Sequence, residues 1–230
     1  MSDHTLPGSP PVPLILRRSG RARRITLRIS RLDGRVTLTL PRGVAEHEAL
    51  DFARSKEDWI RDHLDERPEA CTVAPGGTLP VEGRLRRIAA GPGRRVRLDD
   101  DSIAVPAGAC GPRLQAWLKE LARDRLTAAS DRYAVALGRK YDRITLRDTR
   151  SRWGSCTSDG RLMFSWRLIM APPRVLNYVA AHEVAHLAQM NHPPAFWAEV
   201  ERIHGGYKTQ RAWLKREGNG LHRYRFDTGA

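Results

Sequence analysis

The chain has 230 residues, of which 40% are hydrophobic and six are tryptophan, so it can bury the core of one large domain or two small ones. This composition excludes a disordered chain, and no apolar run approaches the roughly eighteen residues that a membrane span needs. The three cysteines are far apart and odd in number, so they do not indicate a disulfide framework, and no secretion signal precedes the first basic residues. We therefore expect a cytoplasmic protein with no membrane partner.

The formal net charge is +14, and most of the positive residues are arginine. Such a charge is typical of proteins that bind phosphate-bearing partners, so a nucleotide or nucleic acid is a possible partner. The alternative is an arginine-rich surface whose charges are dispersed and solvated. Composition alone does not separate the two.

The N-terminal half of the sequence has the pattern of short strands. Residues 1–13 are rich in Pro, Ser and Gly and are predicted to form a disordered tail. Residues 14–107 are predicted to form a β-rich N-terminal domain. It contains a hairpin around the Asp33-Gly34 turn, a helix over 45–63, and further strands near 79–81, 85–89, 96–98 and 103–105.

The C-terminal half, residues 108–230, has the pattern of a helical domain with a small amount of sheet. A Gly-rich linker over 108–111 leads into a long helix over 112–137, which keeps apolar residues at helical spacing. Two extended segments follow, over 143–146 and 162–166. Then come two proline-initiated helices, over 173–190 and 194–203, and a last helix over 209–217. The fold class is therefore predicted to be α+β.

The candidate metal-binding and catalytic motif is His182-Glu183-Val184-Ala185-His186. Two histidines four residues apart on a helix differ by about 400° of rotation, so their rings project from one face, one turn apart. This geometry allows two imidazole nitrogens to bind one Zn²⁺ ion at about 2.0–2.1 Å. Glu183 lies beside the first ligand, and we expect it to act as general base on a zinc-bound water.

His192 is the predicted third protein ligand. It follows the expected end of the motif helix, and a chain that turns there can bring its imidazole back over the first two. The spacing equals that of H-E-x-x-H-x-x-G-x-x-H, but Gln189 replaces the glycine, so a metzincin-type turn is not implied. Glu199 and His204 on the following helix are the alternative third ligands.

The segment Arg150-Ser151-Arg152-Trp153-Gly154-Ser155-Cys156-Thr157 precedes the motif helix. Arg152 could bind a carboxylate or phosphate or polarise a carbonyl, and the alternative is a solvated arginine beside a core Trp153. Gly154 and Ser155 are typical of a turn or bulge where backbone approaches a substrate. Cys156 is a weak ligand candidate, and Tyr178 is a candidate oxyanion donor.

These motifs, continued by Met163–Leu168, Ala171-Pro172-Pro173 and Phe196-Trp197, resemble the bacterial YgjP-like metallopeptidase family, whose core is related to SprT-like proteases. The resemblance covers about residues 20 to 215. It implies a zincin-like core with His182, His186 and His192 as metal ligands and Glu183 as base. It also implies a small sheet whose edge strand, placed at Met163–Trp166 and including Phe164, binds an extended peptide. Pro193 departs from the serine that the family usually has after the third histidine.

The leading functional hypothesis is therefore a zinc metallopeptidase with a peptide or protein substrate contacted by Arg152, Trp153, Phe164 and Tyr178. The first alternative is a metal-dependent hydrolase of nucleotide phosphoanhydrides, in which the arginines hold the nucleotide. The second is a nucleic-acid-associated protein with a structural zinc, which three histidines disfavour because structural zinc sites are closed by four protein ligands. Imidazole ligands also suit iron, manganese and nickel.

Overall fold

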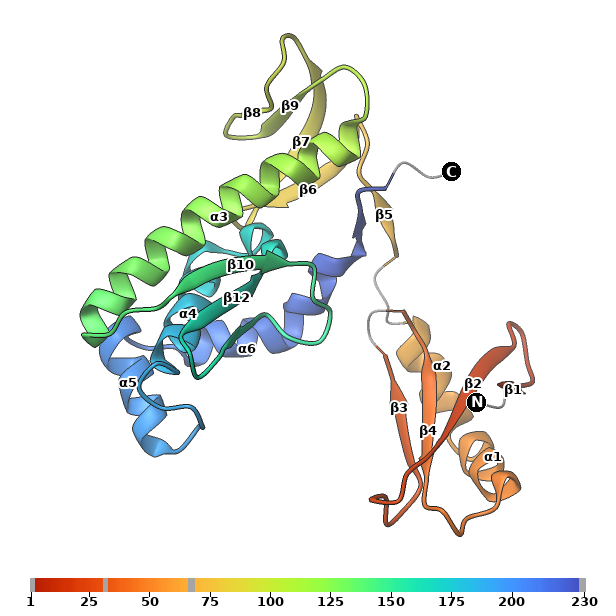
Figure 1. Ribbon diagram of the computed structural model, residues 1–230. Helices are drawn as coiled ribbons and strands as arrows, with labels where there is room; N and C mark the ends of the chain where they lie inside the picture. The colour runs from red at the N-terminus through yellow and green to blue at the C-terminus, as the bar shows by residue number, and fades with distance from the viewer. Residues whose placement is uncertain (1–2, 31–32, 66–68, 228–230) are drawn as a thin grey trace. The chain divides into compact units, whose positions relative to one another are not determined.

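The computed structural model describes residues 3–30, 33–65 and 69–227, and it divides into two compact units, Met1–Glu69 and Ala70–Ala230 (Figure 1). Both units combine helices with small sheets, so the predicted α+β fold class is confirmed.

The sheet of the first unit has the strand order β1-β2-β4-β3. Its strands are β1 (Asp3–Leu6), β2 (Val12–Arg18), β3 (Thr26–Ile29) and β4 (Val36–Leu40). β2 and β4 are parallel, and the other two pairs are antiparallel. The predicted hairpin is the β3–β4 pair, in which Leu27 lies opposite Leu38.

The prediction of a disordered tail is wrong for residues 3–13. Leu6 pairs with Val12, and both side chains are buried, so this segment contributes to the core. The loop between the two strands is held by Arg61, whose guanidinium donates to the carbonyl oxygens of Pro7 and Pro10 at 3.0 and 2.9 Å. The sequence signal was misleading because a Pro/Gly-rich turn and a short strand have the composition of a tail.

The predicted helix over 45–63 is two helices, α1 (Glu46–Arg54) and α2 (Glu57–Asp65). The Ser55 hydroxyl donates to the Phe52 carbonyl oxygen at 2.8 Å. Such a local bond competes with the helical ladder and accompanies the break. Ala49, Ala53 and Ile60 face inward, and they complete a core with the alternating side chains Val36, Leu38 and Leu40.

The second unit begins with strands that the sequence placed in the N-terminal domain. The strands β5 (Cys71–Thr72), β6 (Thr78–Val81), β7 (Arg84–Gly91), β8 (Arg97–Leu98) and β9 (Ser102–Pro106) lie here, and all but β5 form a sheet in the order β6-β7-β9-β8. Leu79, Ile88 and Ile103 are buried in the same core as Leu114 and Leu118 of the following helix. The boundary therefore lies at residues 69/70 rather than 107/108, because the buried side chains of this sheet share one core with that helix.

That helix, α3 (Cys110–Leu137), runs beside a sheet ordered β10-β12-β11 (Figure 1). β10 (Arg143–Arg147) is parallel to β12 (Arg161–Ser165), and β11 (Gly154–Cys156) is antiparallel to it. β12 is thus the central strand, so the expectation that Met163–Trp166 forms the edge is wrong. β11, which the sequence indicated only as a turn or bulge, is one edge.

The remaining elements follow β12 along the chain. They are the 3₁₀ helix η1 (Trp166–Met170), the helices α4 (Pro173–Ala185), α5 (Pro194–His204) and α6 (Lys208–Glu217), the 3₁₀ helix η2 (Gly218–Arg223), and β13 (Tyr224–Arg225), which pairs with β5. η1, α4 and α5 pack against α3. α4 ends at Ala185, five residues before the predicted Met190.

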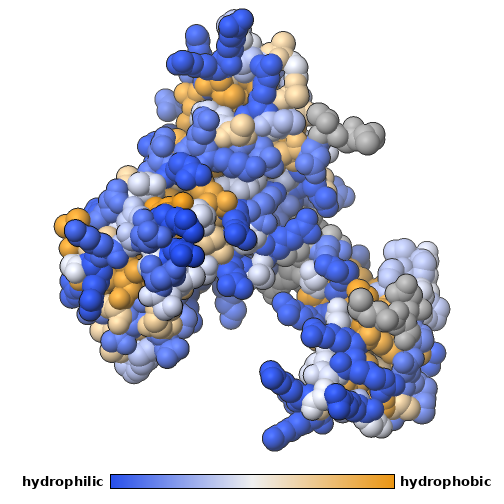
Figure 2. Space-filling view, in the orientation of Figure 1, coloured by the Kyte–Doolittle hydropathy of each residue, from blue (hydrophilic) through white to orange (hydrophobic). Residues whose placement is uncertain are grey.

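Hydrophilic residues cover most of the visible face of each unit (Figure 2). Among the described residues, no helix has the length and apolar character to cross a membrane.

Candidate metal centre

Helix α4 carries the predicted motif into the core of the second unit. It starts with Pro173 in its first turn, where a missing N–H costs nothing, and it packs against α3, α5, α6 and β11. Ala181, Val184 and Ala185 are fully buried, whereas His182 and His186 line a cavity. The helix is therefore a rigid support that presents both imidazoles on one side.

The structure brings His192 to the two motif histidines. Nε2 of His192 lies 3.2 Å from Nε2 of His182, and one ligand nitrogen from each of the three rings lies within 4.8 Å of the others. Because α4 ends at Ala185, residues 187–191 can turn and return His192 to the same face. Phe196 of α5 packs against all three rings, with centroid distances of 4.5–4.9 Å.

The protonation of these rings suits a metal. Burial, with smaller contributions from the other two imidazoles and from Arg211, lowers the pKa of His182 to about 3, and burial also lowers the pKa of His186. Nδ1 of His186 lies 2.9 Å from the Gln189 carbonyl oxygen, to which it can only donate, so Nε2 carries a free lone pair. Neutral imidazoles are the form that binds a divalent ion, so this donor set fits zinc.

His182 and His186 differ in the hydrogen bonding of Nδ1. Nδ1 of His182 is buried and has no hydrogen-bond partner among the described residues. The orientation of its ring therefore depends on packing against Tyr178, Phe196 and Trp197 rather than on an acceptor.

Glu183 lies at the base of the same cavity. Its side chain is only 6% exposed, and burial raises the pKa of its carboxyl to about 8, although the charge of Arg152 acts in the opposite direction. A carboxyl with a raised pKa is a stronger base when ionised than an exposed one. Gly154 lies directly against it, and a Cβ built on this glycine would be 2.6 Å from the Cγ of Glu183.

The cavity has a volume of about 490 Å³, and edge strand β11 forms one of its walls. It is lined by Ser151, Arg152, Gly154, Ser155, Cys156, His182, Glu183, His186, Met190 and His192. Among these lining residues Arg152 is the one Arg or Lys side chain, so the net charge of the chain is not concentrated here.

Of the predicted substrate-binding residues, Arg152 lines the cavity and the other three do not. Phe164 is fully buried in the core, and Tyr178 is 5% exposed and stacks on Tyr207. Burial raises the pKa of Tyr178 to about 12. Trp153 packs against Gly218 and against the ring of His222. The structure thus gives these three side chains packing roles.

The alternative third ligands lie elsewhere. Glu199 accepts from the Arg202 guanidinium at 2.6 and 2.9 Å, and His204 packs against Tyr133 and Tyr178. Cys156 lines the cavity, but burial, with a contribution from Glu183, raises the pKa of its thiol to about 11, so it remains a neutral thiol at pH 7.

Two contributors to the site were not predicted from the sequence. Met190 supplies an apolar side chain to the cavity, and the Gln189 carbonyl oxygen fixes the tautomer of His186. Both follow α4, where the sequence predicted a continuing helix. The segment Asn191-His192-Pro193 indicated that the helix ends before it, but it did not show which residue forms the last helical turn.

Comparison with known proteins gives a family and one solved structure. The model of the family described as YgjP-like, metallopeptidase domain, matches residues 23–217. The crystal structure of the metallopeptidase zymogen of Pyrococcus abyssi abylysin matches with 19% sequence identity over 40% of this chain and 95% of that chain, and the TM-score is 0.36. At that level of similarity it adds nothing to the family assignment. No curated protein matches the chain significantly.

Proposed function

This chain belongs to the YgjP-like metallopeptidase family, and from this premise we propose that it is a zinc-dependent peptidase. His182, His186 and His192 are the proposed metal ligands, and Glu183 is the proposed general base. The observation that carries the proposal is the convergence of three imidazoles and one buried carboxyl on a single cavity.

A zinc ion, when bound, supplies Lewis acidity that polarises the substrate carbonyl and makes water acidic enough to lose a proton near neutral pH. Glu183 takes that proton on a carboxylate oxygen as the water oxygen bonds to the carbonyl carbon. It then delivers the proton to the amide nitrogen as the C–N bond breaks. The products are a carboxylic acid and an amine, and Glu183 is restored.

The substrate backbone is proposed to run along β11. This strand pairs with β12 through one edge, and no described strand occupies its other edge, so its backbone groups can pair with an extended peptide. Arg152 lies at the same wall and is exposed. It is the cation that would bind a substrate carbonyl or carboxylate.

The hydrolysis of phosphoanhydrides is the weaker proposal. Polyphosphate sites need several cations around the transferred group, and Arg152 is the single Arg or Lys side chain among the lining residues. No feature of the described residues favours a nucleic-acid partner at this site.

The test uses the full chain and dye-quenched casein as substrate. The protein is stripped with a chelator, dialysed, and assayed before and after addition of one equivalent of zinc. We expect hydrolysis to appear on zinc addition and to fall by roughly 10²-fold or more in Glu183→Gln, because general-base catalysis is removed while the ligands remain.

The matched control is Glu201→Gln, which makes the same change at an exposed position on α5. It should retain wild-type hydrolysis. Equal activity of Glu183→Gln and wild type would exclude Glu183 as the base. Zinc binding without hydrolysis of any casein bond, together with turnover of ATP that is lost in Glu183→Gln, would replace the peptidase proposal with the phosphoanhydride one.

A further inference from the structure

The first unit has an open sheet edge beside an apolar groove. β3 is the terminal strand of its sheet, and no described strand pairs with its outer edge. An edge strand exposes a row of unpaired N–H and C=O groups, which is the surface that an added strand recognises.

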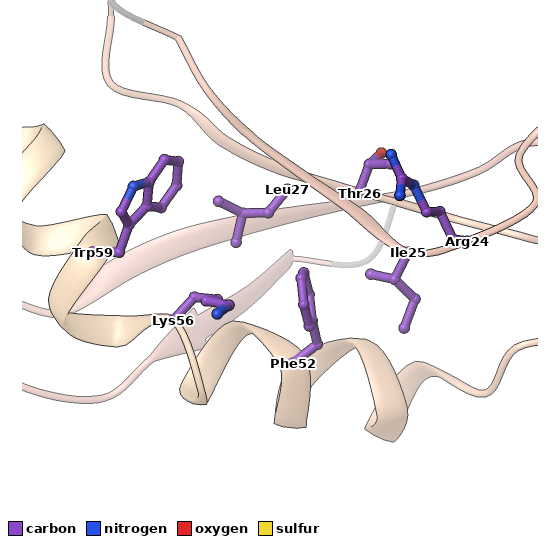
Figure 3. A pocket seen from close by; sticks show the side chains of 7 residues that line it. All are labelled: Arg24, Ile25, Thr26, Leu27, Phe52, Lys56 and Trp59. Carbon is purple, nitrogen blue, oxygen red and sulfur yellow. The ribbon is translucent and has the colours of Figure 1, made fainter.

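The groove lies between this strand and the two helices of the unit and has a volume of about 530 Å³. It is lined by Arg24, Ile25, Thr26, Leu27, Phe52, Lys56 and Trp59 (Figure 3). Trp59 is 43% exposed, which is unusual for the largest apolar side chain. Aromatic residues of this kind are the common anchors of protein interfaces.

Apolar and polar side chains alternate along this edge of the sheet. Along β3 and the two residues that precede it, Ile25 and Leu27 are half-buried and pack on the core of the unit, whereas Arg24, Thr26 and Arg28 are exposed. A strand added to this edge would share the alternation, because successive side chains point to opposite faces. Its apolar residues would meet Phe52 and Trp59, and acidic residues between them would meet the arginines.

We propose that this groove binds an extended segment of a protein substrate in which apolar and acidic residues alternate, by adding it as a strand to β3. The inference rests on the proposed peptidase function for the identity of the partner. Lys56, at the helix side of the groove, adds to the positive potential that attracts an acidic segment.

The composition of the metal-site cavity explains why a second binding surface is useful. Apart from the ligands and Glu183, that cavity is lined by small or polar residues, and Met190 is its one large apolar side chain. It therefore offers little to distinguish one substrate side chain from another. Because both units belong to one chain, a segment held by the first raises the effective concentration of the rest of the substrate at the second.

The groove fits a peptide better than a single-stranded nucleic acid. Nucleic-acid grooves follow the phosphates with a series of cations, whereas four of the seven lining side chains here are apolar and two are cationic. The lining residues also include an edge strand, whose backbone pairs with another backbone and not with bases.

The first test measures binding by fluorescence anisotropy. The protein is the full chain with Glu183→Gln, and the probe is a fluorescein-labelled heptapeptide in which four glutamates alternate with three valines. Trp59→Ala and Lys56→Glu should each weaken binding by about 10-fold or more, and replacing the glutamates of the probe by lysine should do the same. Trp59→Phe, which keeps an aromatic ring, should retain most of the affinity.

Two controls are matched to these variants. Arg54→Glu reverses an exposed charge near Lys56 but outside the groove, and Leu85→Ala removes an exposed apolar side chain of the second unit. Both should bind as the parent does. Absence of binding, equal binding by Trp59→Ala and parent, or binding of oligothymidylate in place of the peptide would each overturn the proposal.

The second test measures hydrolysis with Glu183 intact. A dye-quenched casein peptide is compared with the same peptide joined to the heptapeptide through a flexible Gly/Ser linker. The fused substrate should have a KM at least about 10-fold lower, and Trp59→Ala should abolish that difference between the two peptides. Binding without a change in KM would overturn the assignment to substrate. Hydrolysis of neither peptide would instead contradict the peptidase function, and the anisotropy result would still decide the groove.

Discussion

Gly154 and Glu183 are in direct contact across the candidate metal centre. A Cβ built on Gly154 would lie 2.6 Å from both Cγ and Oε1 of Glu183, closer than real Cβ atoms approach another atom. The glycine is therefore required where β11 passes the carboxyl, because any side chain would occupy the space that the proposed base uses.

Gly154→Ala should displace the Glu183 carboxyl without removing a metal ligand. We expect casein hydrolysis to fall by about 10- to 100-fold, since a shift of about 1 Å in a catalytic group has effects of this size. Zinc content, measured by elemental analysis, should stay at the wild-type value. Gly220→Ala is the matched control, because a Cβ there meets no atom within 4 Å. Loss of zinc in Gly154→Ala would show that the ligands move too.

His192→Ala should reduce zinc occupancy, because it removes the nitrogen that lies 3.2 Å from Nε2 of His182. We expect about one zinc per chain in wild type and Glu183→Gln, and much less in His192→Ala after dialysis against a weak chelator. His47→Ala removes an exposed histidine of the first unit and serves as control. Full occupancy in His192→Ala would exclude it as third ligand.

The stability of the metal-free protein should depend on pH in two directions. The pKa of Glu183 is raised to about 8, so the folded state retains a proton that the unfolded state has released. The free energy of unfolding therefore decreases as pH rises from the ordinary carboxyl pKa through 8, by at most about 1.4 kcal/mol per pH unit. The pKa of His182 is lowered to about 3, so the unfolded state binds the extra proton below pH 6.5 and stability decreases there as pH falls.

Burial also lowers the pKa of His186, and it lowers the pKa of His222 to about 4, so below pH 6.5 the histidines together outweigh Glu183, and maximum stability is expected near pH 6.5. Urea denaturation followed by tryptophan fluorescence measures it for the second unit, since five of the six tryptophans lie after residue 70. Glu183→Gln should remove the alkaline decrease and leave the acidic one. An unchanged alkaline decrease in that variant would mean that another group causes it.

Arg167 should stabilise the C-terminal segment of the chain. Its buried guanidinium donates to the Asp148 carboxylate at 2.6 and 3.0 Å and to the carbonyl oxygens of Leu221 and Tyr224, both at 3.1 Å. Arg167→Met leaves these acceptors without a donor, so we expect the free energy of unfolding to fall by about 2 kcal/mol or more.

Limited proteolysis of Arg167→Met should also cleave the chain after residue 217 earlier than in wild type. Arg161→Met is the control, because Arg161 pairs with Asp159 and Asp142 and all three side chains are about half exposed, so its loss should leave the free energy of unfolding nearly unchanged. Equal stability of the two variants would contradict this role for Arg167.

Local patterns in the sequence predicted the elements that depend on local physics. The alternation of Val36, Leu38 and Leu40 predicted a buried strand face, and all three are fully buried. The prolines at 172–173 and 193–194 predicted the starts of α4 and α5. Errors arose where distant segments pair. The β1–β2 pair, the central position of β12 and the sheet that packs on α3 all depend on partners that no local period specifies.

The sequence by itself determined that His182 and His186 share one face and that Glu183 lies beside them, because helical spacing is set by the backbone within one turn. It also determined the family, because the motifs are contiguous. Only the tertiary structure decided that residues 187–191 return His192 to that face, that Gly154 packs on Glu183, and that β11 rather than β12 borders the cavity. These relationships depend on the packing of α4 against a sheet and a neighbouring helix, which are long-range contacts that spacing along the chain does not encode.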